Sequence, residues 1–159
     1  MIFHYAGKYD GDESKLPYKE HRPNAVPFKE PENMNRLSLI ANVGRVLTMI
    51  ILLIPFMSAE REYILTNTIW LAVGGICSVL SLLPHEILHA LCYRKDVYMY
   101  NNLKQGLMFV VGTEDMSKSR FIFMCLCPNI ILGVIPYVVF FIFPNLIGLG
   151  LFGILCIAM

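Results

Sequence analysis

Charged residues are scarce in this sequence. They make up 16% of its 159 residues, against about 25% in an average soluble domain, while hydrophobic residues reach 56% against about 45–50%. Most of the charges lie before Arg36 or between Arg94 and Arg120, and long apolar runs fill the remainder. Membrane proteins distribute their charge in this way. The composition therefore excludes an ordinary soluble domain.

Three further features are missing. The net charge is only +1 and no basic stripe is present, so we expect no nucleic-acid partner. The first 36 residues lack the apolar core of a signal peptide. The five cysteines include no Cys-x-x-Cys pair, and we interpret them as small hydrophobic residues in a reducing environment.

Residues 1–36 form a polar arm, which we expect to be extended and solvent-facing with little regular structure because glycine and proline interrupt it. Residues 37–159 form the membrane domain. Its apolar runs predict an all-α integral membrane protein with about four transmembrane helices, at 37–57, 64–83, 121–143 and 146–159. The last run covers only about 21 Å of helix, short of the ~30 Å hydrocarbon core, so we expect this span to continue beyond Met159.

Prolines and β-forming residues add detail to this predicted arrangement of helices. Pro84 is expected to kink or restart the second span, and Pro128 and Pro136 are expected to kink the third. Between the second and third spans, residues 97–111 are rich in β-formers and predict a short β-hairpin in the loop.

Basic residues predict the orientation, because cytoplasmic loops carry an excess of Lys and Arg. The arm and the loop after the second span hold most of them, whereas the first loop has only Arg61. We therefore expect a multi-pass protein of the cell membrane with its amino terminus and long loop facing the cytosol.

One motif carries chemistry: His85-Glu86-Ile87-Leu88-His89. Two histidines four residues apart on a helix share one face, so both rings can bind one Zn²⁺. The intervening Glu86 flanks the same site, where it can act as general base toward a zinc-activated water. The sequence thus predicts His85 and His89 as metal ligands, Glu86 as the catalytic residue and Zn²⁺ as the cofactor.

A catalytic zinc takes a third protein ligand, which this motif does not supply. Asp96, Glu114 and Asp115 are better interpreted as solvated loop charges, and Cys92 lies too far along the helix to share the ion with His85. We expect the third ligand beyond Met159.

Asn129, beside Pro128 in the third span, is a candidate for orienting substrate or polarising a carbonyl. The alternative is an ordinary polar residue satisfied between helices.

The Pro84–Ala90 block, the Cys127-Pro128-Asn129 segment and the arm around Glu20-His21-Arg22-Pro23 resemble a bacterial family of zincin membrane peptidases, domain of unknown function 3267. More distantly, the chain is similar to site-2 proteases. The resemblance implies that the two histidines bind zinc, that the glutamate is catalytic and that an aspartate on a later span completes the site.

These observations predict a membrane-embedded zinc metallopeptidase of the HExxH type that hydrolyses a peptide bond in a membrane-associated protein or peptide. Two other classes stay open: a non-catalytic membrane protein with a structural zinc or histidine site, and a transporter or accessory subunit. A structural zinc would have four protein ligands, whereas a proton-relaying transporter would function without metal. We also expect the 97–111 segment to bind an extended substrate by strand addition.

Overall fold

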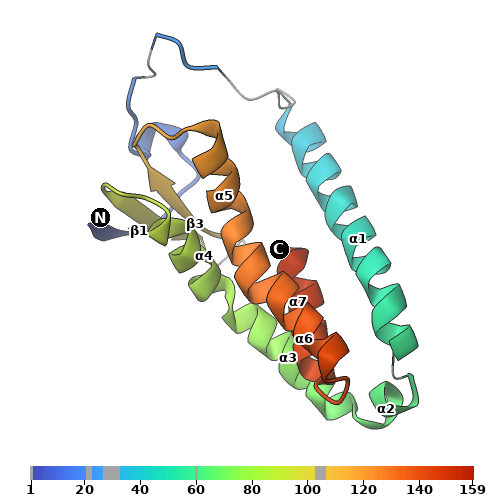
Figure 1. The fold of residues 1–159 in the computed structure, drawn as a ribbon. Coiled ribbons are helices and arrows are strands. Elements are labelled where there is room, and N and C mark those ends of the chain that lie inside the picture. The colour runs from blue at the N-terminus through green and yellow to red at the C-terminus, as the bar shows by residue number, and fades with distance from the viewer. Residues whose placement is uncertain (1, 21–22, 27–32, 60, 103–106) are drawn as a thin grey trace. The chain divides into compact units, whose positions relative to one another are not determined.

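The computed structural model describes residues 2–20, 23–26, 33–59, 61–102 and 107–159. Helices account for most of them, and three strands form one small sheet (Figure 1). In chain order the elements are β1 (Phe3–Lys8), η1 (Glu13–Lys15), α1 (Met34–Ala59), α2 (Arg61–Thr66), α3 (Thr68–Leu80), α4 (Leu82–Leu91), β2 (Val97–Asn102), β3 (Leu107–Gly112), α5 (Lys118–Pro128), the π-helix η2 (Asn129–Val134), α6 (Ile135–Ile142) and α7 (Ile147–Ile157).

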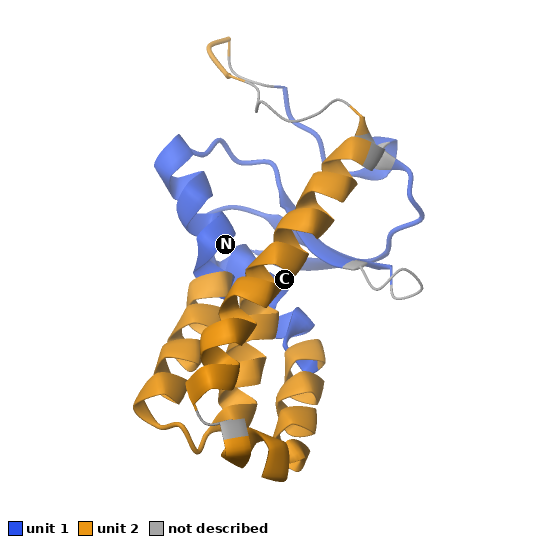
Figure 2. Ribbon diagram, turned by 90° about the vertical axis from the view of Figure 1, so that its right-hand side faces the viewer, with its two compact units in different colours: residues 1–21, 80–128 blue, residues 22–79, 129–159 orange. Residues whose placement is uncertain are grey.

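The chain divides into two compact units (Figure 2). Unit 1 consists of Met1–His21 and Leu80–Pro128, and unit 2 of Arg22–Val79 and Asn129–Met159. Unit 1 contains the sheet, α4 and α5. Unit 1 also contains η1, whereas unit 2 contains α1, α2, α3 up to Val79, η2, α6 and α7, so each unit combines segments that are distant in the sequence.

The sheet of unit 1 has the strand order β1-β2-β3. Strands β2 and β3 are antiparallel, with Val97 opposite Gly112 and Asn102 opposite Leu107, which confirms the predicted hairpin. Strand β1 pairs in parallel with β2. The expectation that the arm has little regular structure is therefore wrong for Phe3–Lys8.

A register shift between Tyr5 and Gly7 interrupts the parallel pairing. Gly7 has a φ of 87°, which residues with a Cβ rarely adopt. Glycine tolerates this backbone conformation at an irregular point of the strand, which explains why a glycine stands there. The parallel strand escaped prediction because its partner is about ninety residues away and its own polar neighbours mask its pattern.

The core of unit 2 is formed by apolar side chains that the helices bring together. Phe56 of α1 and Phe140 of α6 are almost fully buried, and their ring centroids lie 4.9 Å apart. The hydroxyl of Tyr137 donates a 2.7 Å hydrogen bond to the carbonyl oxygen of Leu52, which links α6 to α1. Other buried members of this core are Ile64, Ile147 and Ile154.

Helices α3 and α7 approach each other through glycine. A Cβ added to Gly74 would lie 2.2 Å from the carbonyl oxygen of Gly148, and one added to Gly148 would lie 2.5 Å from the carbonyl oxygen of Trp70. These distances are far below van der Waals contact. The two backbones can pack this closely only because both positions lack a side chain, as at other small-residue contacts between apolar helices.

Among the described residues, two helices are long and apolar enough to cross a membrane: Arg36–Ala59 and Lys118–Ile142. They correspond to the first and third predicted spans. The pair Thr68–Leu80 and Leu82–Leu91 passes the same test together as one broken helix, which makes a third candidate. At eleven residues, α7 covers about 16 Å and is shorter than a span.

The second predicted span, 64–83, is not one continuous helix. Helix α2 ends at Thr66, where the Asn67 side chain donates to the carbonyl oxygen of Tyr63. Helix α3 then runs to Leu80. Pro84 has no N–H to donate to the Leu80 carbonyl, so the helix breaks there, and Pro84 fits the first turn of α4 instead. The restart predicted at Pro84 thus occurs a few residues earlier.

Candidate metal site

Helix α4 carries the HExxH residues and is held at both ends. Its first turn is set when the N–H of His85 donates a 2.8 Å hydrogen bond to the carbonyl oxygen of Ser81. At the other end, the guanidinium of Arg120 donates to the carbonyl oxygen of Cys92 at 2.6 Å. A helix fixed at both ends presents its side chains in a defined orientation.

The loop after α4 is anchored by Glu114, whose carboxylate accepts 2.9 Å hydrogen bonds from the N–H groups of Arg94 and Lys95. The same carboxylate forms an ion pair with Arg120. Burial alone would raise the pKa of Glu114, but these N–H donors and the Arg120 charge lower the pKa below its ordinary value of 4.5. Glu114 is therefore a buried structural carboxylate, and its interpretation as a solvated loop charge is wrong.

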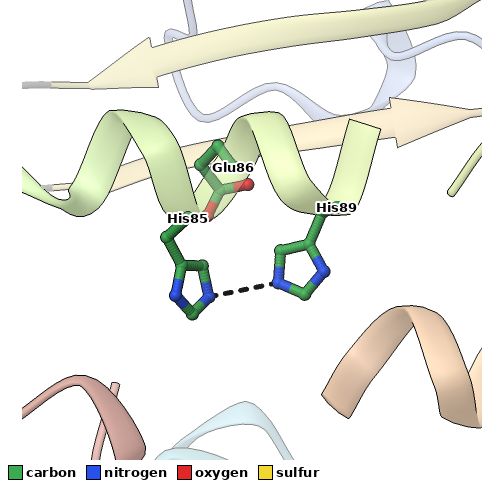
Figure 3. A group of neighbouring side chains, drawn as sticks. All are labelled: His85, Glu86 and His89. Carbon is green, nitrogen blue, oxygen red and sulfur yellow. Dashed lines mark hydrogen bonds between the residues drawn. The ribbon is translucent and has the colours of Figure 1, made fainter. Parts of the chain in front are cut away.

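The two histidine rings project from the same side of α4 and face each other (Figure 3). Their Nε2 atoms lie 3.1 Å apart. The side chain of His85 is buried, with 8% of the residue exposed. Its other nitrogen, Nδ1, is also buried and has no hydrogen-bond partner among the described residues.

His89 is fixed by a second contact. Its Nδ1 atom lies 2.9 Å from the main-chain carbonyl oxygen of Met124 in α5. A carbonyl oxygen only accepts, so Nδ1 carries the proton and Nε2 keeps its lone pair. Met124 was not predicted from the sequence. The available signal is Pro128, since a proline cannot donate to the carbonyl four residues before it.

Glu86 leaves α4 on a different side from the histidines (Figure 3). Its carboxyl group accepts a hydrogen bond from the main-chain N–H of Val110 in β3. One carboxylate oxygen and one nitrogen from each histidine nevertheless lie within 4.8 Å of one another. The acid is thus held beside the metal-binding nitrogens while contacting the edge strand of the sheet.

The donor set fits a zinc ion. Two nitrogens bound to one tetrahedral zinc at ~2.05 Å lie about 3.3 Å apart, close to the 3.1 Å between the two Nε2 atoms. Zinc-bound histidines also donate their second N–H to a carbonyl or carboxylate, as His89 does. Among the residues described, no further His, Cys, Asp or Glu joins this cluster. A third ligand therefore stays a prediction.

The other acidic candidates lie elsewhere. Asp96 is half exposed and lies 3.3 Å from His4, and Asp115 pairs with Lys19 at 3.0 Å. These positions agree with the interpretation of both as loop charges. Cys92 donates through Sγ to the carbonyl oxygen of Leu88 at 3.4 Å, as a packed helical cysteine does.

Asn129 belongs to unit 2, where its side chain donates to the carbonyl oxygen of Ile157 at 3.1 Å. This contact is the one expected of a polar residue satisfied between helices. A role in orienting substrate stays a prediction.

The opposite face of α4 is apolar. Between this face and the sheet lies a cavity of about 630 Å³, lined by Phe3, Tyr5, Leu83, Ile87, Ala90, Leu91, Met99, Asn101 and Met108. None of these is a histidine or an acid. The cavity is therefore an apolar hollow of unit 1 whose lining does not include the metal-ligating side chains.

Comparison with known proteins agrees with this site. A family model described as "Putative zincin peptidase", domain of unknown function 3267, matches residues 78–159. The match includes α4 with both histidines and Glu86, and α5 with Met124. No curated protein and no solved structure matches the chain. Because the model covers more than half of the chain, the protein belongs to the family of zincin peptidases that this model describes.

Proposed function

We propose that this protein is a membrane-embedded zinc metallopeptidase that hydrolyses a peptide bond in a membrane-associated substrate. The observation that carries the proposal is the pair of Nε2 atoms 3.1 Å apart on α4, with the Glu86 carboxylate beside them. Membership of the zincin peptidase family supports the same reaction class. The candidate membrane helices support the location.

Each residue of the motif has a distinct role. His85 and His89 would hold the zinc through Nε2. When bound, zinc supplies a Lewis acid that activates water and polarises the scissile carbonyl. Glu86 would accept the proton of the attacking water and then pass it to the leaving amine. The Val110 N–H restrains Glu86, so the carboxylate is oriented before substrate binds.

The substrate segment would bind as an extended strand along β3. This strand lies at the edge of the sheet, with β2 on its other side. Because the Val110 N–H points to Glu86, the main chain of β3 that faces away from β2 passes directly beside the catalytic acid. A peptide added to that edge by main-chain hydrogen bonds would be placed next to the site.

The proposal also includes how the protein crosses the membrane and which way it faces. The protein would span the cell membrane several times, with its amino terminus and α4 toward the cytosol. The distribution of Lys and Arg supports this orientation. Four spans, the last including α7, would complete the domain.

The test is the zinc content of the full-length protein purified in detergent, measured for the wild type, His85→Ala and Glu86→Gln. We expect about one zinc per chain in the wild type and in Glu86→Gln, and loss of zinc in His85→Ala. Cleavage of a membrane-tethered reporter peptide should require Glu86. Zinc-free wild-type protein would contradict the proposal. Full cleavage by Glu86→Gln would show that Glu86 is not the catalytic residue, and bound zinc without any cleavage would point to a structural zinc.

A further inference from the structure

We propose that Pro128 is a positioning residue for the metal site: by lacking an N–H, it leaves the Met124 carbonyl free to orient His89. This inference rests on the proposed zinc function of His85 and His89 and adds a residue to it. Pro128 lies at the end of α5, and its side chain has no atom that could bind a metal. It acts through the carbonyl oxygen four residues before it.

The argument starts from the hydrogen bonds of an α-helix. In α5 the residue at position 128 would ordinarily donate its N–H to the carbonyl oxygen of Met124. Proline cannot make this bond. The carbonyl lies in the interior, since Met124 is buried, and a buried carbonyl without a donor is costly. The Nδ1–H group of His89 supplies the missing donor at 2.9 Å.

The consequence is a defined tautomer at His89. With the proton held on Nδ1 by the carbonyl, the lone pair of Nε2 points along α4 to the Nε2 atom of His85, 3.1 Å away. His85 shows the contrast, since its Nδ1 has no partner in the described part of the chain. The orientation of the metal-binding pair therefore depends on the contact between His89 and α5.

The second proline of the same helical run provides a matched control. Pro136 lies in α6, after the π-helical segment, and would free the carbonyl of Leu132 in the same way. Pro128 is the last residue of unit 1, which contains the histidines, whereas Pro136 belongs to unit 2. Replacing Pro136 changes the helix without supplying a donor to the Met124 carbonyl.

The experiment compares the wild type with Pro128→Ala and Pro136→Ala in the full-length protein. The alanine at 128 restores an N–H that competes with His89 for the Met124 carbonyl. Loss of such an outer contact typically weakens metal binding 10–100-fold, and we expect roughly 10-fold for Pro128→Ala, measured by zinc competition with a chelator. Pro136→Ala should bind zinc as the wild type does. An equal loss in both variants, or none in Pro128→Ala, would overturn the proposal.

A second readout needs neither zinc nor a variant. In the metal-free wild type, ¹⁵N spectra of histidine-labelled protein should show His89 protonated at Nδ1. His4 should show the opposite tautomer, because its Nε2 faces the Asp96 carboxylate at 3.3 Å. A metal-free His89 protonated at Nε2 would sink the proposal. A correct tautomer with no zinc bound would instead contradict the metallopeptidase function and leave the positioning contact standing.

Discussion

Glu114 and Arg120 form an ion pair in which the carboxylate is only 4% exposed and the guanidinium 21%. Around it, Glu114 accepts from the N–H groups of Arg94 and Lys95, and Arg120 donates to the carbonyl of Cys92. The pair therefore joins the end of α4 to the start of α5. These two helices bring together His89 and the Met124 carbonyl, so the metal site depends on this pair.

Replacing Glu114 by glutamine should destabilise the protein by about 3 kcal/mol, because it leaves a largely buried Arg120 without its counter-charge. The thermal unfolding midpoint in detergent measures the effect. Asp96→Asn is the matched control, since both partners of the Asp96–His4 pair are about half exposed and such pairs contribute under about 1 kcal/mol. Equal midpoints for the two variants would contradict the role assigned to Glu114.

Acid should destabilise the region that Glu114 holds together, between α4 and α5. The pKa of Glu114 is lowered in the folded protein, so its stabilisation is fully present above the ordinary value of 4.5 and is lost as the pH falls through the lower folded value. We expect the thermal unfolding midpoint of the wild type to decrease as the pH is lowered below 4.5. In Glu114→Gln the thermal unfolding midpoint should depend less steeply on pH. Parallel curves for the two proteins would show that other groups control acid unfolding.

Gly74→Ala should destabilise unit 2 by about 1–3 kcal/mol, because the new Cβ would lie 2.2 Å from a backbone oxygen that cannot rotate away. Gly75→Ala is its control. A Cβ there meets nothing within 4 Å, and alanine favours the helix by up to about 1 kcal/mol. Thermal unfolding of both variants measures the difference, and similar stabilities would argue against close packing of α3 on α7.

Cys92→Ser should keep the full zinc content. Cys92 follows α4, and its thiol donates within the helix to Leu88 instead of joining the histidine cluster. A serine hydroxyl can make the same contact. Metal analysis of the purified variant measures the result. Loss of zinc would identify Cys92 as the missing third ligand.

Met108→Pro should weaken substrate binding while leaving zinc bound. Main-chain groups two residues apart on a strand point the same way, so the Met108 N–H faces the same edge as that of Val110. Proline removes this donor, whereas Met108→Ala keeps it and controls for the side chain. We expect a several-fold rise in KM for the reporter peptide with proline alone. Loss of zinc as well would show that β3 is structural.

The two long apolar helices and the hairpin were predictable because each depends on a local pattern. Long apolar runs and clustered β-formers indicate their own secondary structure wherever the chain folds. Strand β1 depends on pairing with residues about ninety positions away, and the break between α3 and α4 depends on which carbonyl Pro84 leaves free. Such features follow from partners that a local pattern does not contain.

The metal site, too, was predictable from local sequence only in part. His85, Glu86 and His89 are adjacent on one helix, so their spacing alone predicts that they lie together. Met124 enters the site through its main chain, and a main-chain group has no residue type by which to recognise it. Glu114 was misinterpreted because its buried partners are the two N–H groups after α4, which only the folded loop brings near.

The parallel pairing of β1 with β2 also limits how the chain can thread a bilayer. Residues 3–8 and 97–102 are hydrogen-bonded in one sheet, and a bilayer cannot pass between hydrogen-bonded strands. If the protein spans a membrane, the chain between Lys8 and Val97 must therefore cross it an even number of times. If α1 is one crossing, the broken pair α3–α4 supplies the other. A single hydrogen-bonded register thus sets a parity rule, under which these two segments cross together or not at all.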